Sequence, residues 1–143
     1  MKNTIEVIRP IRVDESNEFL IERIGNFNYD HNIPKNISFT VVDEGSSAYY
    51  LQKIKDECNK YSVKLITLDR VNELFCPGRA RNFGAMYSNA EYIFFQDLDL
   101  LPYDGFYNDL TDQIEIANIA NDPDQFVMIP CIYLTEEGNK LYD

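Results

Sequence analysis

Short apolar segments with strand character alternate with helix-like segments along the chain, and this alternation constrains the fold more than any other feature. β-Branched and aromatic residues predict strands over 5–13, 37–42, 63–68, 91–97 and 126–130. Apolar residues at helical spacing predict helices over about 16–24, 47–61, 79–89 and 104–118. We therefore expect an α/β layer fold whose open, mainly parallel sheet is flanked by helices.

The size of the chain limits the number of domains. Its 143 residues are 45% hydrophobic and 26% charged, which is enough for one packed core and too little for two ordinary domains. No stretch is low in complexity or rich enough in proline and glycine to be a linker. We expect residues 1–143 to form a single domain, or part of one.

The charge balance excludes some partners. The chain has 24 acidic and 13 basic residues, and its formal net charge is −11. A field of this sign repels nucleic acid and anionic membrane surfaces. No segment approaches the ~20 apolar residues of a membrane span, and the opening MKNTIEVIRP lacks a signal peptide's apolar core. We therefore expect a cytoplasmic protein with no nucleic-acid partner and no membrane span.

The cysteine and histidine pattern favours neither a disulfide framework nor a zinc site. Cys58, Cys76 and Cys131 are far apart and form no CxxC pair, so we expect reduced, mostly buried thiols. His31 is the only histidine, and it lies in the polar stretch NYDHNIPKN, which is typical of a surface loop.

Acidic residues gather where the predicted strands end. The segments after the first four strands are RPIRVD, DEGSS, LDRVN and QDLDLLP, and three of the four carry an acid next to a turn. Ligands of open parallel sheets bind beyond the carboxyl ends of the strands. The sequence therefore predicts a polar site at that edge of the sheet.

Asp97 and Asp99 close the apolar run EYIFF. Residues two apart on an extended segment point to the same face, so the two carboxylates would project together while Leu98 turns back toward the core. Two like charges so placed repel each other unless a positive charge lies between them. Mg²⁺ or Mn²⁺ would supply that charge, since it takes carboxylate oxygens and completes its shell with water and substrate phosphates. Taken alone, the DxD spacing is also compatible with two solvated acids at a strand end.

The order of motifs resembles that of family 2 glycosyltransferases of the GT-A type. Residues 77–99, PGRARNFGAMYSNAEYIFFQDLD, resemble the family segment in which an Ala-Arg-Asn-x-Gly helix leads into an apolar strand ending in DxD. Upstream, VVDEGSS resembles the family's strand followed by an Asp-x-Gly/Ser-Ser turn. The resemblance spans nearly the whole chain, and it implies a GT-A fold whose C-terminal part is missing here.

The resemblance implies a nucleotide pocket at the ends of the first two strands. Asp43 matches the acid that hydrogen-bonds the nucleotide base, usually uracil. Pro10 and Arg12 occupy the place that lines this pocket, although RPIR departs from the family's small and polar residues there.

The resemblance also implies a diphosphate site after the fourth strand. Arg81 matches a residue near the nucleotide and diphosphate, and a guanidinium suits phosphate oxygens. Asp97 would lie near the ribose or the metal, and Asp99 would ligate the Mn²⁺ or Mg²⁺ that bridges the two phosphates. Arg79 could substitute for Arg81, and Asp69 is a further candidate for the base or sugar. Gly84 would let its helix approach the sheet closely.

The implied reaction moves a sugar from a nucleotide diphosphate sugar, UDP by expectation, to the hydroxyl of a saccharide or other acceptor, with inversion. A metal-dependent hexosyltransferase in bacterial polysaccharide synthesis fits this pattern. GT-A domains of this family run well beyond 143 residues, so the general base is expected beyond Asp143. Residues 1–143 would then be the donor-nucleotide-binding half, which need not be active in isolation.

Two alternatives stay open at this point. VVDEG and DLDLLPYDGF are similar to the acidic, Mg²⁺-binding pocket of a phosphorelay receiver domain, although no lysine follows FVMIP until Lys140, where receivers need a strand-end lysine. A non-catalytic module that binds nucleotide, or that packs against another chain, is the second alternative.

Overall fold

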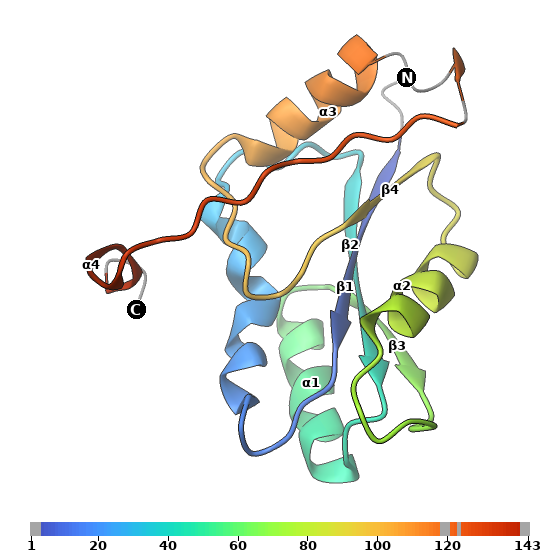
Figure 1. Ribbon diagram of the computed structural model, residues 1–143, viewed down its shortest axis with the longest axis vertical. Helices are drawn as coiled ribbons and strands as arrows, with labels where there is room; N and C mark the ends of the chain where they lie inside the picture. The colour runs from blue at the N-terminus through green and yellow to red at the C-terminus, as the bar shows by residue number, and fades with distance from the viewer. Residues whose placement is uncertain (1–3, 118–120, 123, 141–143) are drawn as a thin grey trace. The chain divides into compact units, whose positions relative to one another are not determined.

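A computed structural model describes residues 4–117, 121–122 and 124–140 (Figure 1). The chain divides into two compact units, Met1–Asp109 and Leu110–Asp143. Every strand of the described residues and both longer helices between strands belong to the first unit. None of the described helices has the length and apolar character needed to cross a bilayer.

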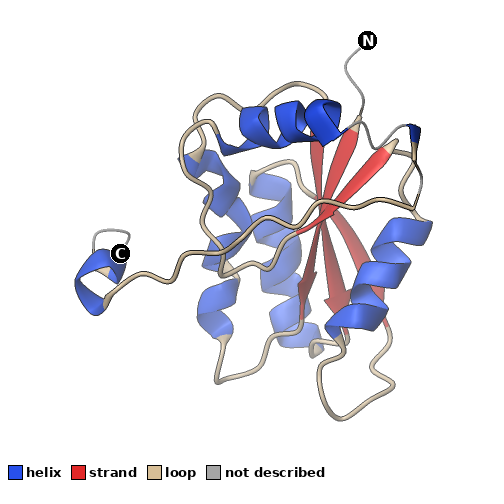
Figure 2. Cartoon of the chain, turned by 45° about the horizontal axis from the view of Figure 1, so that its top comes forward, coloured by secondary structure: helices blue, strands red, loops and turns tan. Residues whose placement is uncertain are grey.

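The first unit is built on a four-stranded parallel sheet with strand order β3-β2-β1-β4. Figure 2 draws its strands in red. The strands are β1 (Ile5–Ile11), β2 (Ile37–Glu44), β3 (Lys64–Leu68) and β4 (Tyr92–Phe95). All seven residues of β1 are buried, as expected for a central strand of a parallel sheet. The predicted α/β fold with a parallel sheet is confirmed, as are the first four predicted strands.

The strand order argues against a receiver domain. Receivers have the flavodoxin-like order 2-1-3-4-5, in which the third strand lies beside the first. Here β4 takes that place, and β3 lies at the far edge beside β2. The acidic motif therefore does lie beside β1, but it follows the fourth strand in chain order rather than the third, and β3 adds a strand beyond β2 that the receiver order lacks.

Two helices connect the strands of the first unit. Helix α1 (Ala48–Lys60) joins β2 to β3, and α2 (Pro77–Met86) joins β3 to β4. Pro77 stands in the first turn of α2, where a missing N–H costs nothing. A Cβ on Gly84 would lie 2.6 Å from Ile8 Cγ2, so the predicted close approach of this helix to the sheet is confirmed.

The predicted helix over 16–24 is wrong. The chain instead forms two 3₁₀ stretches, Glu18–Leu20 and Glu22–Tyr29. The carbonyls of Arg23 and Ile24, in the second of these stretches, accept hydrogen bonds from Arg9. Gly25 does not end a helix. A Cβ there would lie 2.3 Å from the Tyr61 ring, so this glycine makes room for the ring.

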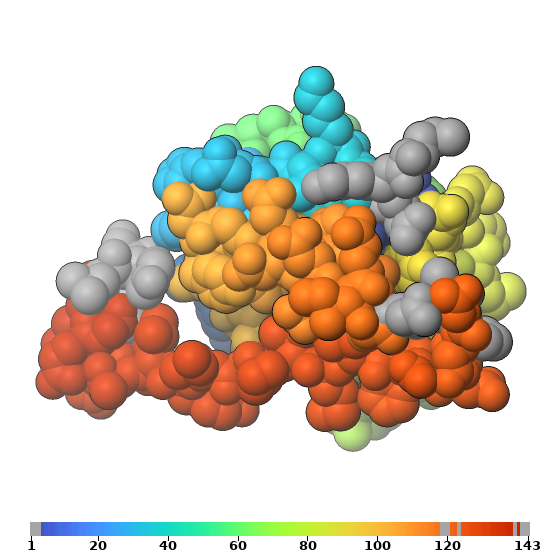
Figure 3. All heavy atoms as spheres, turned by 90° about the horizontal axis from the view of Figure 1, so that it is seen from above, coloured from blue at the N-terminus to red at the C-terminus, as the bar shows by residue number. Residues whose placement is uncertain are grey.

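Helix α3 (Phe106–Ala117) lies within the predicted helix 104–118, and its first four residues belong to the first unit. In the second unit, the predicted strand 126–130 is wrong, because described residues 125–135 form neither strand nor helix and are drawn as a loop in Figure 2. Figure 3 shows the heavy atoms of the same segment in orange and red. A strand needs a neighbouring strand to pair its backbone, and the described part of the second unit contains none. Helix α4 (Glu136–Asn139) follows, with the Thr135 side chain accepting a hydrogen bond from Gly138 N.

The predictions made for the cysteines and His31 are confirmed only in part. All three cysteines are free, as predicted. Only Cys58 is buried, whereas Cys76 is partly exposed and Cys131 is exposed, so the expectation of mostly buried thiols is wrong. His31 lies in an exposed turn, as predicted.

Candidate functional site

The carboxyl ends of the strands lie level at one edge of the sheet. In the strand register, Ile11 of β1 is opposite Asp43 of β2, which is opposite Thr67 of β3. The chain leaves β1 toward β2 on one side and returns as β4 on the other. Such a switch point opens a crevice beyond the strand ends, where open α/β sheets bind ligands.

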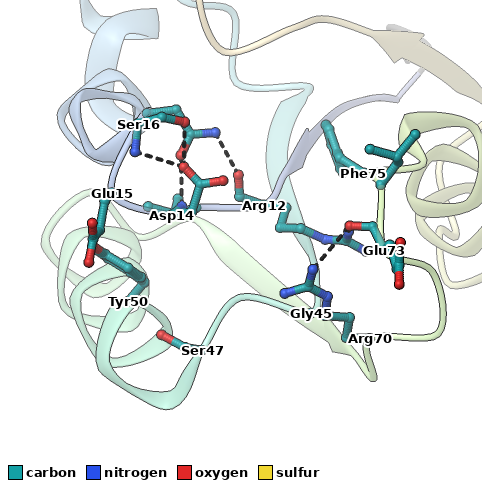
Figure 4. A pocket seen from close by; sticks show the side chains of 13 residues that line it. Arg12, Asp14, Glu15, Ser16, Gly45, Ser47, Tyr50, Arg70, Glu73 and Phe75 are labelled. Carbon is teal, nitrogen blue, oxygen red and sulfur yellow. Dashed lines mark hydrogen bonds between the residues drawn. The ribbon is translucent and has the colours of Figure 1, made fainter.

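A larger cavity of about 650 Å³ lies beyond the ends of β1, β2 and β3 (Figure 4). Its wall carries both signs of charge, with Arg12, Arg70 and Glu73 on one side and Asp14 and Glu15 on the other. Of the residues predicted to bind nucleotide, Arg12 is the one that lines it.

A smaller cavity of about 230 Å³ lies where β1 and β4 end. It brings together four predicted residues, which are Pro10, Arg81, Asp97 and Asp99. Phe75 lines both cavities, so the two adjoin.

The aspartates lie in a turn rather than on the strand. Strand β4 ends at Phe95, and Leu98 and Asp99 form a turn, so the expected extended geometry is wrong. Leu98 is 3% exposed and both aspartates are exposed, so Leu98 does face the interior as predicted. Arg81 Nη2 lies 2.6 Å from Asp97 Oδ1.

Asp43 lies at the predicted strand end but on the wall of neither cavity. It is 1% exposed, and its carboxylate accepts hydrogen bonds from the backbone N–H and the hydroxyl of Ser46. Burial raises the pKa of Asp43, although the Ser46 hydrogen bonds act in the opposite direction. The carboxylate therefore supports the turn that follows β2.

Arg12 ties the ends of three strands together. Its Nε donates to the Glu44 carbonyl at 2.5 Å, and its Nη2 forms an ion pair with the Glu44 carboxylate. Nη1 donates to the carbonyls of Asn72 and Glu73 at 3.2 and 3.1 Å. The guanidinium thus holds the loop that follows β3 against the end of β2.

Glu44 is a site residue that sequence reasoning missed. Its side chain is fully buried and accepts from Arg79 Nη1 at 3.0 Å and from Cys76 N at 3.1 Å, in addition to Arg12. Three arginines near the strand ends signal the need for a buried counter-ion, and the acid after Asp43 could have been assigned that role.

Gly45 completes the turn at φ +85°, where a Cβ would lie 2.4 Å from the Cβ of Arg70.

The two candidate arginines, Arg79 and Arg81, have different surroundings in the structure. Arg79 donates to Glu44 and, at 3.0 Å, to the carbonyl of Asp69. Arg81 instead lines the smaller cavity, and its Nε is buried without a hydrogen-bond partner among the described residues. Arg81 is therefore the arginine placed to meet an anion in that cavity.

Asp30, also missed from the sequence, anchors the segment that follows the aspartates. Its buried carboxylate accepts backbone N–H groups from Gly105 at 3.0 Å and from Tyr107 and Asn32 at 2.9 Å. Burial raises the pKa of Asp30, but the three N–H groups outweigh that effect and the net pKa is lowered.

Asp30→Asn is expected to lower the free energy of unfolding by about 2 kcal/mol near neutral pH, because an amide accepts these N–H groups less strongly than a carboxylate. Because the folded-state pKa lies below the unfolded value of 3.8, the stabilisation is present above that value and is lost as the pH falls through the folded pKa. Urea unfolding of both proteins across this pH range measures the difference. Asp56→Asn on the surface of α1 is the control, and a gap independent of pH would contradict the assignment.

The residues present fit a hard cation held jointly with a ligand. Among the described residues, no cluster of three or more His, Cys, Asp or Glu side chains could hold a metal by itself. The smaller cavity offers two carboxylates, Asp97 and Asp99. Mg²⁺ and similar cations are commonly bound by one or two carboxylates together with water and substrate phosphates. The site therefore suits a cation that binds with a phosphorylated ligand better than it suits an all-protein metal centre.

Comparison with known families gives one match that covers almost the whole chain. The family described as "Glycosyltransferase like family 2" matches residues 6–143. No curated protein matches the chain significantly.

Several solved structures share the fold. TarS 1–349 of S. aureus is 24% identical with a TM-score of 0.62, over 80% of this chain and 33% of that one. Its complex with UDP-GlcNAc is 23% identical with a TM-score of 0.63, over 80% and 32%. The mannosyltransferase PcManGT from Pyrobaculum calidifontis, in complex with GDP-Man and Mn²⁺, is 16% identical with a TM-score of 0.59, over 80% and 32%. The expected GT-A fold is confirmed, and the chain spans about a third of the length of these proteins.

Proposed function

Because this chain belongs to the glycosyltransferase-like family 2, we propose that it forms the donor-binding part of an enzyme that transfers a sugar from a nucleotide diphosphate sugar to an acceptor hydroxyl. The observation that carries the proposal is the smaller cavity, which gathers Arg81, Asp97 and Asp99 at the switch point between β1 and β4. An arginine and two carboxylates there suit a diphosphate and a divalent cation together.

The donor would extend across both cavities. We place its diphosphate in the smaller cavity and its nucleoside toward the larger one, with Phe75 bordering both. Pro10 and Arg12 would line the nucleotide. Asp43 would recognise the base, which requires the Ser46 hydroxyl to turn away from the carboxylate that it now contacts.

The nucleotide is proposed to be UDP. The VVDEGSS turn carries the acid that pairs with uracil in the family pattern, and one neighbour was solved with UDP-GlcNAc. The neighbour solved with GDP-Man and Mn²⁺ supports both a metal and the wider class of nucleotide donors.

The residues of the site would assist departure of the diphosphate. Asp97 and Asp99 would hold Mn²⁺ or Mg²⁺, which when bound neutralises negative charge that grows on the leaving group. Arg81 already pairs with Asp97 and lines the same cavity, so its guanidinium can reach phosphate oxygens without leaving the site. We further propose that the reaction inverts the anomeric carbon and that the general base lies beyond Asp143. The acceptor would be a saccharide in bacterial polysaccharide synthesis.

Titration calorimetry of the 143-residue chain with UDP and GDP, in Mn²⁺ and in EDTA, tests this function. We expect UDP to bind in Mn²⁺, at least tenfold more weakly in EDTA, and more tightly than GDP. Failure of the folded chain to bind either nucleotide in Mn²⁺ would overturn the proposal. Equal affinity in Mn²⁺ and EDTA would favour the non-catalytic nucleotide-binding module.

A further inference from the structure

A buried polar network begins at Arg9, in the middle of the central strand. Arg9 is 0% exposed, and its Nη1 and Nη2 donate to the carbonyls of Ile24 and Arg23 at 2.8 and 3.1 Å. Nη2 also donates to Asn26 Oδ1. The described residues give Arg9 no carboxylate partner, and burial lowers its pKa to about 10, so it stays charged at neutral pH. A buried charge without a counter-ion is costly, which suggests a role beyond packing.

Asn26 connects Arg9 to the turn that contains Asp99. It is 5% exposed, and its Nδ2 donates to the carbonyls of Leu98 at 2.8 Å and Leu100 at 3.1 Å. Those two carbonyls stand on either side of Asp99. Because Arg9 can only donate, it holds the amide oxygen toward itself and therefore turns the amide N–H groups toward the turn.

Neighbouring contacts hold the rest of the segment. The Tyr107 hydroxyl donates to Gln96 Oε1 at 3.0 Å, just before Asp97, and Asp30 accepts the N–H groups of Gly105 and Tyr107. Around Asp99, the turn is closed by its own backbone, where Leu100 N donates to the Asp97 carbonyl at 3.2 Å, and Asn26 binds the carbonyls of Leu98 and Leu100.

We propose that Asn26, oriented by Arg9, is a positioning residue that holds the backbone on both sides of Asp99 so that its carboxylate is presented to the cation and diphosphate. This inference rests on the proposed function. A ligand-binding carboxylate must be held to within a fraction of an ångström, and buried hydrogen bonds to its own backbone supply that restraint.

Asn26→Asp separates positioning from packing. The aspartate has the same shape and still accepts from Arg9, but it has no N–H for the carbonyls of Leu98 and Leu100. We expect UDP affinity in Mn²⁺ to fall about tenfold, while affinity in EDTA stays within about twofold. Asn28→Asp is the matched control, because it adds the same charge to an exposed position of the same 3₁₀ stretch.

Calorimetry with UDP in Mn²⁺ and in EDTA measures the affinity of each variant, and the melting temperature shows whether the variant is folded. Equal losses in both buffers, or unchanged affinity in Mn²⁺, would overturn the positioning role. Should Asn26→Asp not fold, Asn26→Ser carries the same test with an uncharged side chain. If the unmodified chain binds no nucleotide, it is the proposed function that fails, whereas a binding chain with an unaffected variant refutes only the role of Asn26.

Discussion

Replacing Glu44 by alanine is expected to lower the free energy of unfolding by about 4 kcal/mol, because it leaves a buried guanidinium without its counter-ion. Glu44 is fully buried, and it pairs with Arg12, whose side chain is 8% exposed, and with Arg79. The Cys76 backbone N–H would also lose its acceptor. The loss is larger than that of an exposed ion pair because the Glu44 side chain is fully buried and the Arg12 side chain is nearly so.

Urea unfolding followed by circular dichroism measures this effect. Glu22→Ala, which removes an exposed glutamate from the 3₁₀ stretch, is the control and should change the unfolding free energy by less than about 0.5 kcal/mol. A loss below about 1 kcal/mol for Glu44→Ala would mean that the Glu44 network contributes little. We also expect weaker UDP binding by this variant, because Arg12 and residues 73–75, which Arg12 holds through the Glu73 carbonyl, line the larger cavity.

Asp99→Asn is expected to weaken UDP binding in Mn²⁺ roughly 100-fold, equivalent to about 2.7 kcal/mol, with little change in EDTA. An amide cannot offer the anionic oxygen that a hard cation prefers. Asp99 suits this test better than Asp97, because Asp97 also pairs with Arg81 and its replacement would mix two effects.

Because Asp99 is exposed, its replacement should change nucleotide binding without changing the stability of the fold. Its replacement should leave the melting temperature within the spread of Asp56→Asn, an exposed control on α1. Titration of UDP into each variant, with Mn²⁺ and with EDTA, gives the affinities. Unchanged affinity of Asp99→Asn in Mn²⁺ would show that this carboxylate does not ligate the cation.

Local patterns predicted the strands correctly where a neighbouring strand was available. The runs that became β1 and β2 are apolar and β-branched, and each is paired along its whole length, β2 with the help of β3. The segment 126–130 has the same character, but the described part of its unit contains no strand to pair with. Strand character in a sequence is therefore a necessary condition, and pairing decides the outcome.

The first helix failed for a related reason. Residues 16–24 carry helical spacing, but the segment forms 3₁₀ stretches, and the buried guanidinium of Arg9 donates to the carbonyls of Arg23 and Ile24 within the second one. The residues of that segment do not indicate that its hydrogen-bond partner is an arginine 14 or 15 positions upstream. Propensity is a weak prior, and tertiary hydrogen bonds overrode it here.

The strand–helix alternation, the acids at the strand ends and the spacing of Asp97 and Asp99 could all be predicted before folding was considered, because periodicity and strand-end chemistry are properties of short segments. The identity of the buried counter-ion and of the side chain that holds the aspartate turn could not be predicted, because both depend on long-range contacts. Glu44 meets Arg12 across 32 positions, and Asn26 meets Leu98 across 72. Contacts of that range exist only after the sheet has formed, because burial in the folded core is what makes each polar group require its particular partner.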